Sequence, residues 1–215
     1  DGVSVINQSY GTYDEKGMPY LVENMLDVWR KHKYMTFVNA AGNEGVVLDP
    51  GSHDDIENVI FVGATNQQGK ITYWSNRPGE HYKHQFIVAP GDYISGGFSW
   101  SDKDYGWMSG TSMAAPVVTG AVALLHSYWG HLKNNPVATA NILYESATDL
   151  GTKGVDAIYG HGLLNIKNAF DPLAIVADPG NGGDTGDSGD TGDSGDAGDD
   201  CNDTILDDPF EPSYP

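Results

Sequence analysis

The part of the sequence that most constrains the fold is a Gly-Thr-Ser turn followed directly by an apolar run. The run extends from Met113 to Leu125 and is interrupted by Thr119 alone. It is shorter than the roughly 17–25 residues that a membrane-spanning helix needs. Pro116 is tolerated in the first turn of a helix, where the N–H that proline lacks has no partner. The segment is therefore predicted to be a buried helix with Pro116 in its first turn and Ser112 at its N-terminus.

This position gives Ser112 a chemical environment that suits a nucleophile. Free backbone N–H groups and the helix dipole favour negative charge at a helix N-terminus, so an oxyanion formed by attack on a carbonyl would be stabilised there. For an arbitrary serine, simple helix capping is the better interpretation. The complete string from Gly110 to Pro116, Gly-Thr-Ser-Met-Ala-Ala-Pro, is more specific and resembles the nucleophile segment of the subtilisin-like serine proteases.

Two further segments resemble the same family and occur in its order. Thr36 to Gly45 is an apolar strand with a glycine turn, and it resembles the segment whose amide stabilises the oxyanion. Val5 to Gly11 resembles the strand whose Ser-x-Gly end pairs with the substrate backbone. Taken alone, each segment is an ordinary strand and turn. The resemblance implies that Asn43 is an oxyanion donor and that the substrate is bound by Ser9, Tyr10, Gly11, Ala40, Ala41 and Gly42.

The motifs for the catalytic base and acid do not occur where the family has them. Both precede the segment that resembles Val5 to Gly11, and here only four residues do. The His161-Gly162 pair matches a later turn of the family, and the Asp-Ser/Thr-Gly triplets lie in a low-complexity tail. A serine nucleophile needs a base and an acid that orients it. We therefore expect the catalytic Asp and His upstream, on residues outside this chain or on a separate chain, and the chain by itself to be inactive.

The hydrophobic pattern predicts an α/β fold, incomplete at the N-terminus. Uninterrupted apolar strands are expected at residues 3–7, 36–41, 59–64 and 86–89. An amphipathic helix is expected over 21–33, and Asn135 should cap a helix that begins at Pro136. Alternating strands and helices indicate a parallel sheet with helices on both faces, the subtilisin-like three-layer arrangement. Catalytic groups would then gather at the carboxyl edge of the sheet.

The charge is concentrated at the C-terminal end. Residues 178–215 contribute −12 of the net charge of −19 and contain no Lys or Arg. This balance argues against binding to nucleic acid or to an anionic membrane surface. We expect three parts: residues 1–177 from the peptidase domain, an acidic low-complexity linker over 178–200, and the start of an unassigned segment over 201–215. Between Asp184 and Asp199 every third residue is aspartate, which favours a solvated linker over the alternative of weak calcium binding.

The remaining candidate residues carry less information. One cysteine, Cys201, excludes a disulfide within the chain without fixing its compartment. His81 and His84 are interpreted as part of an exposed loop, not a metal site. Trp100, Tyr105 and Trp107 either wall a substrate cleft or pack on the sheet.

These features predict part of a secreted or cell-surface bacterial serine endopeptidase. Its partners would be polypeptide substrates and the upstream part of the same domain, with no membrane span in this chain. The chemistry would require no cofactor, although structural calcium is compatible with the sequence. The alternative is a non-catalytic peptide-binding module with a degenerate protease fold. An Asp-Ser/Thr-Gly strand and a His-Gly-Thr helix upstream would distinguish the two.

Overall fold

The computed structural model describes residues 2–13, 19–20, 23–48, 56–97 and 103–171. The chain divides into two units, residues 1–176 and 177–215, and the described residues all belong to the first. The acidic linker, Cys201 and Trp100 lie outside the described residues.

A four-stranded parallel sheet forms the centre of the first unit, in the order β1-β4-β5-β6. Its strands are β1 (Val5–Gln8), β4 (Thr36–Ala40), β5 (Val59–Thr65) and β6 (Phe86–Pro90). All residues of β4 and β5 are buried, because apolar groups cover both faces of these strands. The predicted parallel sheet is confirmed, with strand ends that differ from the expected ones by one or two residues.

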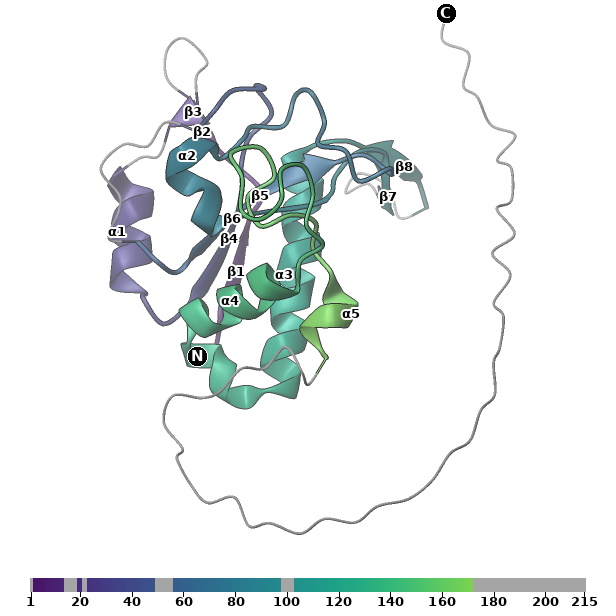
Figure 1. The fold of residues 1–215 in the computed structure, drawn as a ribbon. Coiled ribbons are helices and arrows are strands. Elements are labelled where there is room, and N and C mark those ends of the chain that lie inside the picture. The colour runs from purple at the N-terminus through teal and green to yellow at the C-terminus, as the bar shows by residue number, and fades with distance from the viewer. Residues whose placement is uncertain (1, 14–18, 21–22, 49–55, 98–102, 172–215) are drawn as a thin grey trace, which may run out of the picture. The chain divides into compact units, whose positions relative to one another are not determined.

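Helices lie on both faces of this sheet (Figure 1). Alternate strand residues pack against these two layers. Val38, Ile60 and Ile87 pack with the buried side of α3 (Thr111–Tyr128). Phe37, Phe61 and Phe86 pack on the other face with Leu26 and Trp29 of α1 (Glu23–Lys31). The period of two along a strand separates these two cores, and helices cover both faces as predicted.

The helices on the α3 side are α4 (Pro136–Ser146), the 3-10 helix η2 (Gly130–Asn134) and the short α5 (Ile166–Ala169). Asn135 caps α4 as predicted, since its side chain accepts a hydrogen bond from Ala138 N. The other face carries α2 (Gly79–Tyr82), which continues into the 3-10 helix η1 (Lys83–Gln85). His81 and His84 therefore lie on short helices, and the expectation of a loop was wrong.

Two small antiparallel pairs complete the described part. These are β2 (Thr12–Tyr13) with β3 (Pro19–Tyr20), and β7 (Ile94–Gly97) with β8 (Tyr105–Met108). Two residues, Ser109 and Gly110, separate the end of the β7–β8 hairpin from the start of α3. Tyr105 and Trp107 are largely exposed on it, which excludes the interpretation that they pack on the central sheet. Within the described residues, no helix has both the length and the apolar character to cross a bilayer.

Candidate functional site

The candidate site lies where two chain segments meet at the carboxyl edge of the sheet. β4 ends at Ala40 and leads into the turn that carries Asn43. The hairpin β7–β8 leads through Ser109 and Gly110 into the first turn of α3. The Thr111 backbone N–H donates to Asn43 Oδ1 at 2.9 Å, and Thr111 Oγ1 donates to the same atom at 3.0 Å. Asn43 and Ser112 are 69 residues apart in the sequence, and these bonds hold Asn43 against Thr111, the residue directly before Ser112.

The hydrogen bonds of Thr111 also fix the orientation of the Asn43 amide. A backbone N–H can only donate, so the atom that faces it must be the amide oxygen and not the nitrogen. The Asn43 Nδ2 group is then directed away from Thr111. A Cβ placed on Gly110 would lie 3.7 Å from both Asn43 Nδ2 and Ser112 N. These two nitrogen donors therefore border the same space beside Gly110, where the lack of a side chain leaves room.

Ser112 is the second residue of α3, and its hydroxyl is half-buried. Its Oγ donates to the carbonyl oxygen of Ser9 at 3.1 Å, while Ser9 Oγ donates to the carbonyl oxygen of Ser112 at 2.8 Å. This reciprocal pair joins the end of β1 to the first turn of α3. In the part of the chain that the structure describes, no imidazole is hydrogen-bonded to Ser112 Oγ.

Pro116 lies in the second turn of α3, not in the first turn as the sequence analysis expected. The N–H that proline lacks would have bonded to the carbonyl of Ser112, four residues earlier. The Ser9 hydroxyl takes that carbonyl instead. The proline therefore leaves the carbonyl of Ser112 without a helical N–H partner, and Ser9, the residue that follows β1, donates to it instead.

The structure places the other candidate residues close to these two segments. Ala40 and Ala41 are buried, and Ala41 N donates to Val62 O. Gly42 has a φ of +100°, in the left-handed region that favours glycine, and its N–H donates to Thr111 Oγ1. Tyr10 and Gly11 are exposed after β1. The Tyr10 hydroxyl accepts a hydrogen bond from Gln8 Nε2 at 3.0 Å, which holds the ring beside the strand.

Three residues of this region had no assigned role in the sequence analysis. Thr111 and Gly110 stand inside the recognised string, so the motif itself held the signal for them. The third, Asn76, is fully buried and hydrogen-bonded to the turn that carries Asn43. The sequence around it, Trp-Ser-Asn-Arg-Pro, reads as an ordinary polar loop and gives no signal.

The histidines of the described chain lie elsewhere. His126 is buried near the far end of α3, bonded to Ser4 Oγ and Thr139 Oγ1. Burial, with a smaller effect of Lys133, lowers its pKa. His161 stacks on the Tyr144 ring, and burial lowers its pKa as well. Among the described residues, no group of three or more His, Cys, Asp or Glu side chains is arranged to hold a metal ion.

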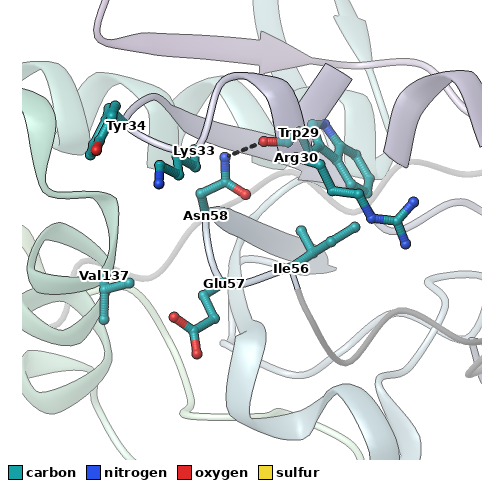
Figure 2. A pocket seen from close by; sticks show the side chains of 8 residues that line it. All are labelled: Trp29, Arg30, Lys33, Tyr34, Ile56, Glu57, Asn58 and Val137. Carbon is teal, nitrogen blue, oxygen red and sulfur yellow. Dashed lines mark hydrogen bonds between the residues drawn. The ribbon is translucent and has the colours of Figure 1, made fainter. Parts of the chain in front are cut away.

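A hollow of about 520 Å³ opens at the opposite edge of the sheet (Figure 2). Its walls come from the end of α1, the residues that precede β5 and the start of α4. The residues that line it are Trp29, Arg30, Lys33, Tyr34, Ile56, Glu57, Asn58 and Val137. Since β4 and β5 begin beside it and Asn43 follows the end of β4, the hollow is separate from the candidate site.

Comparison with known proteins places this arrangement in a family. The model of the Peptidase_S8 (subtilase) family matches residues 1–162. The chain is 31% identical to Serotype-specific antigen 1 of Mannheimia haemolytica over 79% of its own length and 19% of that protein. It is 40% identical to an Extracellular serine protease of Serratia marcescens over 76% of its length and 15% of that protein.

Solved structures agree with this match. The structure of the Prenylagaramide maturation protease PagA superimposes with a TM-score of 0.60 at 32% identity, covering 77% of this chain and 60% of that one. The chain thus spans less than two thirds of each of these three proteins. The family match covers β1 and the Ser9 that follows it, the turn of Asn43 and the first turn of α3. The chain belongs to the subtilase family of serine proteases.

Proposed function

We propose that the complete protein is a serine endopeptidase that hydrolyses peptide bonds through an acyl-enzyme on Ser112. The observation that carries this proposal is the contact between Thr111 and Asn43, which brings an amide donor and a serine hydroxyl to one point at the N-terminus of α3. Ser112 is the nucleophile in this proposal. Asn43 Nδ2 and the Ser112 backbone N–H are the donors that stabilise the oxyanion.

The proposal assigns the base and the acid to residues that precede Asp1 in the complete protein. A serine hydroxyl of ordinary acidity is a weak nucleophile until a base accepts its proton. The Ser112 hydroxyl donates to Ser9 O in this chain, so an imidazole would have to replace that acceptor. The greater length of the relatives leaves room for such a segment.

Substrate contacts are assigned to the segments on either side of Ser112. Ser9, Tyr10 and Gly11 on one side, and Ala40, Ala41 and Gly42 on the other, would line the path of an extended polypeptide. An extended substrate chain can pair with backbone groups at strand ends, as in other strand-addition complexes. We also propose a secreted or cell-surface bacterial location, supported by the Extracellular serine protease of Serratia marcescens among the relatives.

The experiment that tests the function is Ser112→Ala in the complete protein. Peptidase activity on casein should fall by about 10⁶-fold, the scale of this loss in subtilisin, a member of the same family. The circular dichroism spectrum and the melting temperature should stay close to those of the unchanged protein. An alanine variant that keeps more than a few per cent of the activity would contradict the assignment of Ser112. Peptide binding without any cleavage by the unchanged protein would favour the degenerate binding module.

A further inference from the structure

Asn76 is a buried amide that uses all of its hydrogen-bonding groups on one turn. Its side chain is completely shielded from solvent. Nδ2 donates to Ala41 O at 2.9 Å and to Glu44 Oε2 at 2.7 Å. Oδ1 accepts from Glu44 N and Val46 N, each at 3.1 Å. A carboxamide has two N–H donors and one oxygen with two acceptor sites, so this side chain is fully satisfied.

The turn that Asn76 contacts is the one that carries Asn43. Asn43 lies between Ala41 and Glu44, so the bonds of Asn76 hold the chain on both sides of it. The backbone N–H of Asn76 adds a bond to Gly42 O at 3.0 Å. The contact is close, because a Cβ on Gly42 would lie 2.4 Å from Asn76 Nδ2. Asn76 thus supports the turn from one side, while Thr111 holds the Asn43 side chain from the other.

We infer that Asn76 is a positioning residue for catalysis, which sets the place of the Asn43 amide through the turn of residues 41–46. The inference rests on the proposed function of Asn43. An oxyanion donor acts at about 2.7–3.1 Å from the developing charge, so a small displacement removes most of its effect. Misplacement by about 1 Å is enough to lower turnover by roughly 10²-fold. Asn43 is itself exposed, and its own side chain cannot define the path of the backbone.

The test uses Asn76→Asp in the complete protein, because aspartate has the same shape and lacks both N–H donors. Its carboxylate would face Ala41 O and the Glu44 carboxylate, two acceptors that repel it. We expect kcat on a short peptide anilide to fall by about 10–100-fold, with KM within about threefold of its original value, since the displaced donor acts on the transition state. The assay temperature should lie well below the melting temperature of every variant.

A second substitution makes the geometry itself testable. In Asn76→Asp, a further change of Glu44→Gln supplies an amide N–H that can donate to the new carboxylate, which restores one of the two lost hydrogen bonds with its direction reversed. Asn76→Asp lowers log kcat relative to the unchanged protein, and the double variant should reverse at least a third of that decrease. Glu44→Gln alone completes the cycle of variants. The coupling between the two substitutions then measures the contact and not general damage to the fold.

The matched control is Asn58, a second buried amide at the other end of the same sheet. Its Nδ2 donates to the carbonyl oxygens of Trp29, His32 and Met35, and Figure 2 shows the bond to Trp29. Asn58→Asp removes donors from another buried position, 6% exposed where Asn76 is 0% exposed, at the amino edge of the sheet. It should lower the melting temperature about as much as Asn76→Asp while it leaves kcat within about twofold.

The outcomes separate this inference from the function on which it rests. A fall in kcat for Asn76→Asp beyond that of Asn58→Asp, partly reversed by Glu44→Gln, supports the inference. An unchanged kcat in Asn76→Asp, a change confined to KM, or an equal loss in Asn58→Asp overturns it. Activity that survives Ser112→Ala would instead refute the proposed function, whatever the Asn76 variants do.

Discussion

Thr111 holds the turn that carries Asn43 against the first turn of α3. Its N–H and its hydroxyl both donate to Asn43 Oδ1, and its hydroxyl oxygen also accepts from Gly42 N. A single threonine thereby fixes which end of the Asn43 amide is directed away from Thr111. Serine at the same position would keep these groups, whereas valine would keep only the shape and the backbone N–H.

The role of Asn43 can be tested with Asn43→Leu, which has a similar size and no N–H donor. Turnover of a peptide anilide should fall by about 10²–10³-fold, the range known for one such donor in subtilisin, a member of this family. KM should change much less, because the lost hydrogen bond meets charge that exists only in the transition state. Steady-state kinetics of the purified complete protein measure both constants. An effect limited to KM would make Asn43 a structural residue of the turn.

The elements that bear the site could mostly be predicted from the sequence, because their signals are local. The apolar runs of β4, β5 and β6 and the cap at Asn135 follow from hydrophobicity and cap preference alone. The β7–β8 hairpin was missed, since its three paired glycines and exposed aromatic residues form no alternating pattern. Asn76 was missed because its burial depends on contacts with residues more than 30 positions away. Recognition of Ser112 and Asn43 came from family motifs, and neither role follows from periodicity.

Helix α3 also contains a buried histidine that links three elements. His126 Nδ1 lies 2.8 Å from Ser4 Oγ, and Nε2 lies 3.1 Å from Thr139 Oγ1 on α4. The Thr139 hydroxyl can donate its single proton to Asn135 O at 2.9 Å or to Leu132 O at 3.2 Å. With the proton on either carbonyl, Thr139 Oγ1 accepts from His126 Nε2–H, and Nδ1 accepts from Ser4. The neutral imidazole satisfies both neighbours.

This histidine predicts a loss of stability in mild acid. Above the ordinary pKa of 6.5 the imidazole is neutral in the folded and the unfolded chain, and it has no pH-dependent effect. Below 6.5 the unfolded chain binds a proton that the folded chain resists, so the free energy of unfolding decreases until the pH passes the lowered folded pKa. The melting temperature of the unchanged protein should therefore fall more between about pH 7.5 and pH 5 than that of His126→Gln. His161 titrates in the same direction and is present in both proteins. Parallel pH profiles for the two would contradict this assignment.

At the scale of the whole molecule, the described sheet has one open side at β1. β1 pairs with β4 along one of its edges, and no described strand pairs with the other edge of β1. Val5 and Ile6 are only half-buried there, whereas β4 is buried throughout. The relatives are longer than this chain, and the proposed upstream segment could supply strands for that side. An uncovered edge of this kind favours association between chains.

The expected consequence is that this chain in isolation neither hydrolyses peptides nor reacts efficiently with a serine-directed phosphonate. None of the described histidines is hydrogen-bonded to the Ser112 hydroxyl, and the open edge should cause aggregation. Co-expression with the upstream segment should restore both solubility and labelling at Ser112. The amount of soluble protein measures the first, and mass spectrometry of the labelled protein measures the second. Rapid labelling of the isolated chain at Ser112 would mean that one of its own histidines serves as the base, against the proposed division of the site.

The bond between Ser9 and the Ser112 carbonyl has a consequence for the order of folding. The backbone hydrogen bonds of helix α3 are local, but its first turn is completed by partners 68 and 103 residues away in the sequence. Bringing such distant segments together is slower than forming a helical turn, because a long loop must be closed first. During refolding, helical circular dichroism should therefore return before the ability to react at Ser112. The surroundings of Ser112 would then be among the last parts of this fold to mature.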